Sequence, residues 1–308
     1  MPSDGPQSQV EAESGEVLCW LTLVLRIGAC ACFAGWAWQH LRWSSPYDAV
    51  LWNPDLFGWL ANAFNVSWET YVSEIVTDQR IMLAGRAVGF FYLTMAVMAA
   101  TAKRDSLVQL SFLGLGSGLL ALSAFCKYVG AGYAIAMLVE QGGQVLSPVA
   151  LILALRRGVG DRWTIGVAVA ALCSTFTGHG VYASGLAPTP GHFYGMTSAI
   201  LGLGEQAADV FLKVVGVLDF VVCLGVFVPA LRRLSLAYAT VWGLLTALAR
   251  PVAGMSLAAA WWGADQFLHE AVFRMPHACL PLFLFLVFQT RESVGADENS
   301  VGAVSASD

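Results

Sequence analysis

Long apolar stretches recur along the whole length of this 308-residue chain. Most of them approach the roughly 20 residues that an α-helix needs to cross a bilayer. Only 12% of the residues are charged, against roughly 25% in an average soluble domain. Because backbone polar groups in lipid must be bonded within the protein, the pattern predicts an all-α, polytopic transmembrane helix bundle of about eight spans. The expected spans are 17–41, 81–102, 106–126, 131–155, 163–186, 209–231, 235–260 and 274–289.

The basic residues between these spans predict their orientation. Those that fall on one side of an eight-span layout are Lys103, Arg104, Arg156, Arg157, Arg162, Arg232, Arg233 and Arg291. The positive-inside rule therefore predicts that both termini are cytoplasmic. The expected location of this multi-pass protein is the cell (inner) membrane. The polar, acidic ends of the chain, 1–16 and 291–308, are expected to be disordered tails. The opposite-side segment 44–80 mixes aromatic and acidic residues, which is typical of short amphipathic helices at a membrane interface.

Two of the expected spans contain helix-breaking residues. The fourth is interrupted by Gly142, Gly143 and Pro148, and the eighth is short and contains Pro276 and Pro281. Proline removes a backbone donor and kinks or ends a helix. Both spans are therefore expected to be kinked.

The two halves of the chain resemble each other, which indicates an internal repeat. The segment "FAGWAWQHL" at 33–41 has its counterpart in "FTGHGVYASG" at 176–185, and "SGLLALSAF" at 117–125 matches "WGLLTALAR" at 242–250. Between them, "GRAVGFFYLTMAVMAATAKR" matches "LKVVGVLDFVVCLGVFVPALRR". Four spans per copy give both copies the same orientation, unlike an inverted repeat. The expected units are 17–158 and 159–290.

The second unit carries a resemblance to a known family. Gly216, Asp219 and the closing Arg232 and Arg233 lie in a pattern similar to the second helix of DoxX-like integral membrane proteins. The segment "GHGVYASG" followed by "PTPGHF" resembles the first helix and outer loop of that family. The first unit has Tyr92 where the acidic residue would be, so the chain looks like a degenerate tandem of two such four-helix units. The resemblance implies a place near quinone-linked redox systems, such as thiosulfate:quinone oxidoreductase, with quinone and a membrane redox protein as partners.

Ionisable side chains at membrane depth are costly and are therefore candidates for function. Asp219 lies about ten residues into its span and needs either a partner or a proton. Arg250, on the next helix, is the expected partner in a buried Asp219–Arg250 pair, and a proton or ligand site at Asp219 is the alternative. Besides the polar start of the last span, the candidates at membrane depth are Arg26, Arg86, Lys127, Glu140, His179, Lys213, Asp219 and Arg250.

The polar start of the last span, "DQFLHEAVFRMPHACL" at 265–280, is the second candidate region. In a helix Glu270, Arg274 and His277 share one stripe, while Asp265 and His269 form a neighbouring pair. These groups are interpreted either as partly solvated ion pairs at the outer face or as a ligand or quinone site. In the second reading His and Arg would hydrogen-bond a carbonyl, and an aromatic ring would stack on Trp261, Trp262 and Phe273.

The histidines allow two further interpretations, a metal or haem site and a site shared by several histidines. A metal or haem site is the weakest interpretation, because His269 and His277 do not share one helix face and no metal-ligand motif is present. His179 and His192, at the outer end of the fifth span and in the following loop, are on the same side as His269 and form a candidate shared site. No metal ligand is predicted.

Several classes of protein are excluded by the sequence. It has no phosphate-binding loop, no nucleophile elbow and no paired-cysteine metal motif. A net charge of −5 without a basic patch argues against nucleic-acid binding. We predict an integral membrane protein that is a redox-associated or quinone-interacting subunit. A small-molecule transporter or permease component and a non-catalytic scaffold are the alternatives, and whether the chain is an enzyme stays open. The candidate site residues are Asp219, Arg250, His269, Glu270, Arg274, His277 and His179.

Overall fold

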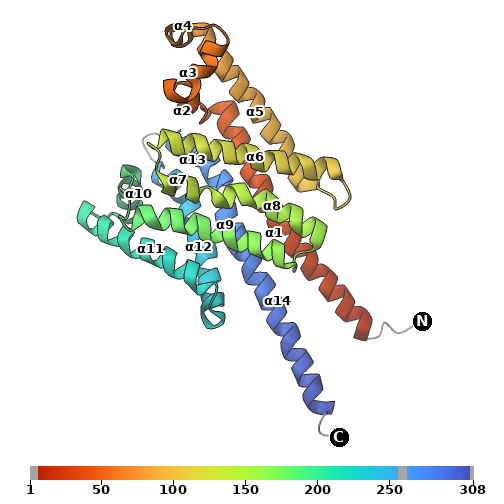
Figure 1. The fold of residues 1–308 in the computed structure, drawn as a ribbon. Coiled ribbons are helices and arrows are strands. Elements are labelled where there is room, and N and C mark those ends of the chain that lie inside the picture. Colours follow the sequence, from red (N-terminus) through yellow and green to blue (C-terminus); the bar gives the residue numbers. More distant parts are fainter. Residues whose placement is uncertain (1–5, 256–261, 306–308) are drawn as a thin grey trace.

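The chain forms a bundle of α-helices (Figure 1). The computed structural model describes the backbone of residues 6–255 and 262–305 and the side chains of 18–255 and 263–291. Within these ranges the regular structure is entirely helical, which confirms the predicted fold class. The helices are α1 (Pro6–Arg42), α2 (Asp48–Leu51), α3 (Pro54–Ala63), α4 (Trp68–Ser73), α5 (Ile75–Thr101), α6 (Leu107–Gly130), α7 (Ile135–Glu140), α8 (Gly142–Arg157), α9 (Arg162–Ala183), α10 (Gly191–Leu201), α11 (Glu205–Gly225), α12 (Pro229–Ala253), α13 (Trp262–Phe273) and α14 (Pro276–Ser305).

Seven segments in the described part of the chain are long and apolar enough to cross a membrane. They lie in α1, α5, α6, α7 with α8, α9, α12, and α13 with α14. The remaining expected span, 209–231, overlaps α11, a 21-residue helix that carries Asp209, Lys213 and Asp219. These three charged residues distinguish it from the seven segments, although it packs beside α9 and α12. The chain is thus a multi-pass integral membrane protein, in agreement with about eight spans.

The fourth expected span is interrupted, whereas the eighth, 274–289, is interrupted only at its start, and both Pro148 and Pro281 lie inside continuous helices. The fourth span is divided at Gln141 into α7 and α8, and the last is divided after Phe273, so that Pro276 becomes the first residue of α14. A proline in the first turn of a helix loses no hydrogen bond, because that N–H has no partner within the helix. These two breaks place charged residues at helix ends rather than in mid-helix.

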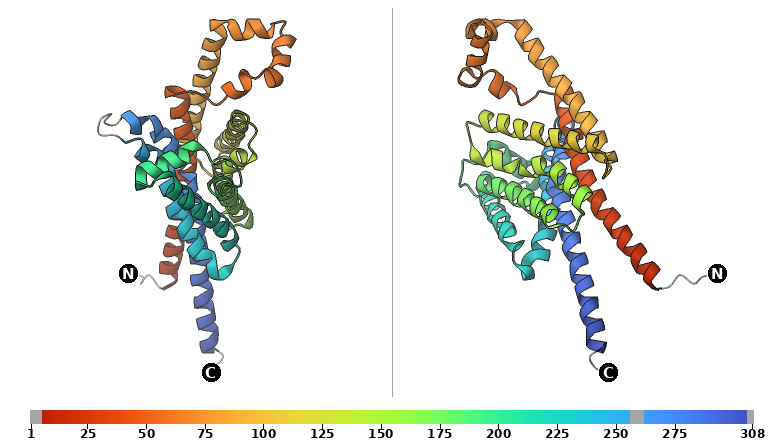
Figure 2. Two further views of the ribbon diagram at one scale, coloured as in Figure 1. Left: turned by 90° about the vertical axis from the view of Figure 1, so that its left-hand side faces the viewer. Right: turned by 45° about the vertical axis from the view of Figure 1, so that its right-hand side comes forward.

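The helices alternate in direction, so the start of α1 and the end of α14 lie at the same end of the molecule (Figure 1). The loops that follow α5, α8 and α11 belong to this end. We call the other end, where the short helices α2–α4, α7, α10 and α13 lie, the distal end. Figure 2 shows α2–α4 projecting beyond the rest of the bundle there. The composition predicts disordered tails at 1–16 and 291–308, yet the helical backbone of α1 begins at Pro6 and that of α14 continues to Ser305.

One succession of elements occurs twice along the chain. A long helix is followed by short distal helices, two long helices, one short helix and a final long helix, first from α1 to α8 and then from α9 to α14. Gly158 lies in the turn that joins the two series and has a φ of 104°, which only glycine adopts readily. The expected boundary between residues 158 and 159 therefore lies in a turn.

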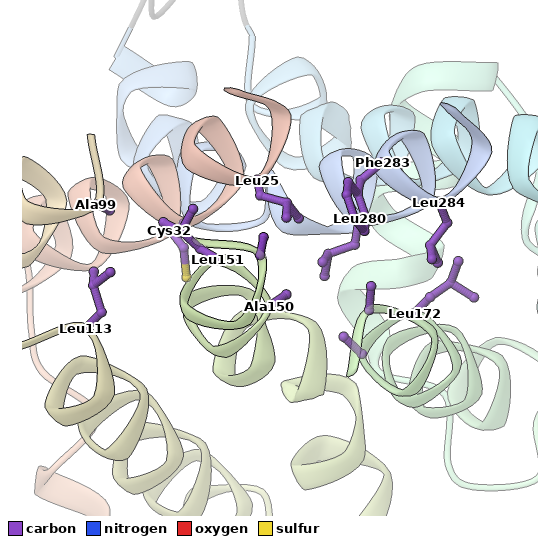
Figure 3. Close-up of a cluster of buried hydrophobic side chains, with 14 of the residues drawn as sticks. Leu25, Cys32, Ala99, Leu113, Ala150, Leu151, Leu172, Leu280, Phe283 and Leu284 are labelled. Atoms are coloured by element: carbon purple, nitrogen blue, oxygen red, sulfur yellow. The ribbon is translucent and has the colours of Figure 1, made fainter. Parts of the chain in front are cut away.

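An apolar core fills the middle of the bundle. Helices α1, α8, α9 and α14 pack against one another there, with α5 and α6 on one side and α11 and α12 on the other. Figure 3 shows side chains from these central helices, among them Leu25, Leu151, Leu172 and Phe283, meeting in one cluster. All four are almost completely buried.

Candidate functional site

Three charged side chains meet at the distal end of the second half and form the charge cluster, which we define as Arg250, Glu270 and Arg274. Arg250 Nη1 donates to both carboxylate oxygens of Glu270, at 2.9 and 2.6 Å. Arg274 Nη2 lies 3.4 Å from Glu270 Oε2. The three side chains are 23%, 14% and 14% exposed, so the contacts are largely shielded from water. The predicted Glu270–Arg274 pair is confirmed, with Arg250 as a second cation on the same carboxylate.

The expected Asp219–Arg250 pair is wrong. Arg250 lies in the last turn of α12, at the distal end, where it reaches Glu270 on α13. Asp219 lies in α11, faces α9 and is completely buried. His179 Nδ1 donates to Asp219 Oδ2 at 2.8 Å. The buried carboxylate therefore has a histidine as its partner.

A glycine brings the two helices of this His179–Asp219 pair together. A Cβ atom on Gly216 would lie 2.4 Å from the backbone nitrogen of Ser184, a distance that real Cβ atoms do not reach. Because Gly216 has no side chain, α9 and α11 approach until their backbones touch. Gly216 belongs to the motif that carries the family resemblance, and its structural role is to permit this contact.

His277 approaches the pair from α14. A Cβ atom on Gly243 would lie 2.1 Å from the carbonyl oxygen of His277, so α12 and α14 are also in backbone contact. Asp219 and His277 border a small cavity of about 20 Å³ together with Trp242. A cavity of this size holds about one water molecule. Asp219 Oδ1 and His277 Nε2 have no partner within the described chain, so this cavity is polar on two sides.

His192, on α10, contacts the charge cluster through Arg250. Arg250 Nη2 donates to His192 Nε2 at 2.8 Å, which requires the imidazole to be neutral. Although part of the ring is exposed, partial desolvation and the nearby Arg250 and Arg274 guanidiniums lower the pKa of His192 to about 4. His192 is therefore a hydrogen-bond acceptor at neutral pH. The rings of His179 and His192 both contact the ring of Phe193, with centroid distances to Phe193 of 5.2 and 5.0 Å, respectively.

His269 lies apart from the other candidate residues. Its ring packs near Trp38, Trp43 and Phe273, with centroid distances of 6.4, 6.1 and 6.0 Å. Its Nδ1 has no hydrogen-bonding partner among the described residues, so the expected pair with Asp265 is not formed. The proposed sharing of a site with His179 and His192 is also absent, since His269 faces α1. The expected contacts of Trp261 and of the Trp262 side chain fall outside the described residues.

The first half of the chain contributes two charged residues that sequence reasoning did not assign to the site. Lys127, in the last turn of α6, has its ammonium 4.7 Å from the ring centroid of Trp36 and 4.8 Å from that of Phe273. Glu140 is the last residue of α7 and is 8% exposed. The sequence marks both as ionisable candidates at membrane depth but does not group them with the residues of the second half. Lys127 and Glu140 lie in the last turns of α6 and α7, as Arg250 and Glu270 lie in the last turns of α12 and α13. This shared position at helix ends is the signal that could have identified them.

Two cavities meet at these charged residues. The lipid-side cavity has a volume of about 340 Å³ and lies between α10, α11 and α12. Its walls are mostly apolar, and its polar end is formed by Glu140, His179, Arg250, Arg274 and His277. Rim residues that are 40% to 53% exposed are Ile200, Leu201, Leu245, Leu248 and Val252. Since exposed apolar side chains of a membrane protein face lipid, this cavity opens laterally toward the bilayer.

The second cavity, which we call the distal cleft, has a volume of about 440 Å³. It lies between the end of α6, the loop that precedes α2, and the charge cluster. The two cavities share the side chains that separate them, namely Glu140, Phe193, Arg250 and Arg274. The same charged groups are therefore accessible from an apolar side and from a polar side.

Neither a family model nor a curated protein nor a solved structure matches this chain. Over the residues whose side chains are described, no three His, Cys, Asp or Glu side chains form a group that would hold a metal ion.

Proposed function

We propose that this membrane protein binds a quinone in the lipid-side cavity and serves as a redox-associated subunit. The observation that carries the proposal is an apolar cavity, open to lipid, whose polar end holds the guanidiniums of Arg250 and Arg274 beside two histidines and Glu140. Quinones have a hydrophobic tail, which keeps them in the bilayer, and a neutral ring with two carbonyl acceptors. Guanidinium N–H groups of Arg250 and Arg274 would donate to one carbonyl, and the rings of Phe193 and Trp242 offer faces for stacking.

The size of the cavity agrees with this class of ligand. Ligand sites typically enclose about 300–1,000 Å³, and the volume of about 340 Å³ is at the lower end of that range. It therefore accommodates a ring and the first part of a tail, with the rest of the tail in the bilayer beyond Ile200 and Leu248. The electron-transfer partner of such a subunit would be another membrane protein.

We also propose the tandem DoxX-like architecture in a bacterial inner membrane, with both termini cytoplasmic. The doubled succession of helices supports it, and so does one pair of equivalent positions. Where the repeat places His179 and Asp219 in the second unit, the first unit has Trp36 and Tyr92, whose ring centroids are 6.2 Å apart. An aromatic contact thus replaces the ionisable pair, which agrees with chemistry confined to the second unit.

Transport is the second candidate function, and the shared wall of the two cavities favours it. A side chain such as Arg274 that separates two cavities is placed where a gate would be. On the other hand, the apolar core, including Leu25 and Leu172, fills the bundle between this wall and the end that holds the termini. A transport path would therefore require a second conformation.

Quinone extraction from protein in lipid nanodiscs tests the proposal. Ala249 lines the lipid-side cavity without belonging to the charge cluster, so Ala249→Trp would fill the cavity. Leu244 lies on the same helix and is 39% exposed, and Leu244→Trp is the matched control. We expect ubiquinone or menaquinone analogues to bind the wild type and Leu244→Trp but not Ala249→Trp. Equal binding by all three would refute the site, and solute uptake in vesicles without quinone binding would favour transport.

A further inference from the structure

The distal cleft has a chemistry different from that of the lipid-side cavity. Its walls come from both halves of the chain, with Lys127 and Glu140 from the first and Arg250, Glu270 and Arg274 from the second. These five side chains give three cations and two carboxylates. Asp48 is a further carboxylate in the lining, but it is exposed at the rim, where water and salt screen its charge. The inner part of the cleft therefore has an excess of one positive charge.

Lys127 is the cation that lacks a counter-charge. Its Nζ lies 3.5 Å from Gln141 Oε1 and over two aromatic rings. Throughout the described ranges, no carboxylate lies within ion-pair distance of it. Glu270 is already bound by two guanidiniums. A shielded ammonium is costly unless an anion approaches it, and aromatic faces offset only part of that cost.

Arg274 supplies further donors toward the same space. Its single ion pair, with Glu270, uses one nitrogen at 3.4 Å. A guanidinium has five N–H donors in a planar fork that matches a carboxylate or a phosphate. The room of about 440 Å³ exceeds what a bare inorganic ion needs, and Tyr182, Phe193 and Phe273 add apolar walls.

We propose that the distal cleft is a second binding site, for an organic anion whose carboxylate or phosphate is bound by Lys127 and Arg274. This site shares Arg274 with the proposed quinone site but lies in the other cavity, and Lys127 lines only the distal cleft, so its existence does not rest on quinone binding. The anion balances the excess positive charge, and its carbon skeleton lies against the aromatic walls. Because the distal end is the one that would face the outer aqueous phase, the ligand is a soluble anion or the headgroup of an anionic lipid at that surface.

Calorimetric titration of the full chain in phosphatidylcholine nanodiscs tests the site, with benzoate, succinate and glycerol 3-phosphate as probes. Lys127→Met keeps the length of the side chain and removes its charge. We expect it to weaken binding about tenfold or more, since contacts to charged groups have this effect. Lys213→Met, on an exposed lysine paired with Asp209, is the control and leaves binding unchanged.

A second pair of variants keeps the test valid if Lys127→Met does not fold. Ala131 lines the cleft away from the charge cluster. Ala131→Glu adds a carboxylate there and should abolish anion binding, whereas Ala131→Gln, of the same shape, should retain it.

The source of the anion is distinguished by nanodisc composition. Binding of soluble probes identifies a soluble ligand. If these fail, a higher Tm in phosphatidylglycerol than in phosphatidylcholine, lost in Ala131→Glu but kept in Ala131→Gln, identifies a lipid headgroup. The proposal is overturned if the wild type neither binds the soluble probes nor has a higher Tm in phosphatidylglycerol. It is also overturned if Ala131→Glu and Ala131→Gln change anion binding equally. Ala249→Trp should leave anion binding intact, so failure of the quinone site is recognised separately.

Discussion

Replacing Glu270 by Gln should destabilise the protein far more than a carboxylate-to-amide change normally does. Glu270 lies between Arg250 and Arg274, with contacts of 2.6 and 3.4 Å, and is 14% exposed. Glu270→Gln keeps the shape of the side chain but leaves two shielded guanidiniums without their anion. Removing one partner of a fully buried pair costs about 3–5 kcal/mol. Because Arg250 is 23% exposed and a cleft lies next to it, we expect about 3 kcal/mol, at the lower end of that range.

The assay is equilibrium unfolding in detergent, with the exposed pair of Asp209 and Lys213 as the matched control. These side chains are 35% and 56% exposed, so water screens the pair and Asp209→Asn should destabilise the protein far less than Glu270→Gln does. In a double-mutant cycle, Arg250→Met combined with Glu270→Gln should cost less than the sum of the two single changes, with a coupling of about 0.5–3 kcal/mol. Equal effects of Glu270→Gln and Asp209→Asn, or strict additivity in the cycle, would refute the reasoning.

Two further predictions concern helix packing and pH. Gly216→Ala should lower the Tm, because its Cβ would lie 2.4 Å from a backbone nitrogen of α9, whereas Gly166→Ala, with no atom within 4 Å of its Cβ, should not. The thermal unfolding of both variants checks this, and a lower Tm for Gly166→Ala alone would contradict it. The lowered pKa of His192, about 4 in the folded protein, means that the unfolded chain binds a proton first as the pH falls. Stability should therefore decrease between about pH 6.5 and pH 4, and His192→Gln should reduce that decrease; an unchanged pH profile would show that His192 is not the group responsible.

The apolar stretches alone determine the class of the fold. A run of about 20 apolar residues has few stable states outside a bilayer, and within one it must be helical, because its backbone bonds can be made only within the run. The kinks near Gln141 and Pro276 are local as well, since glycine and proline act on their own turn of helix. The pair of Glu270 and Arg274 was equally predictable, because positions four apart in one helix are neighbours in any helix.

The contacts between helices depend on the tertiary structure. Asp219 needed a partner, and its position in the sequence made Arg250 a reasonable candidate. The partner is His179 because Gly216 lets α9 approach α11, and neither the neighbour of a helix nor its axial offset is encoded within that helix. His269 was grouped with the site from its position in the sequence, yet its side of α13 packs on α1.

The distal cleft shows most clearly the difference between features that are local in the sequence and features that depend on packing between helices. Lys127 and Glu140 are separated from Arg250, Glu270 and Arg274 by more than a hundred residues in the sequence, and only the packing of the two halves places all five around one space. Hydrophobicity and helix periodicity are local properties, so the amino-acid sequence is enough to predict a helical membrane protein with charges at helix ends. Which of those charges share a cavity follows only from the folded structure, because it depends on contacts between distant helices.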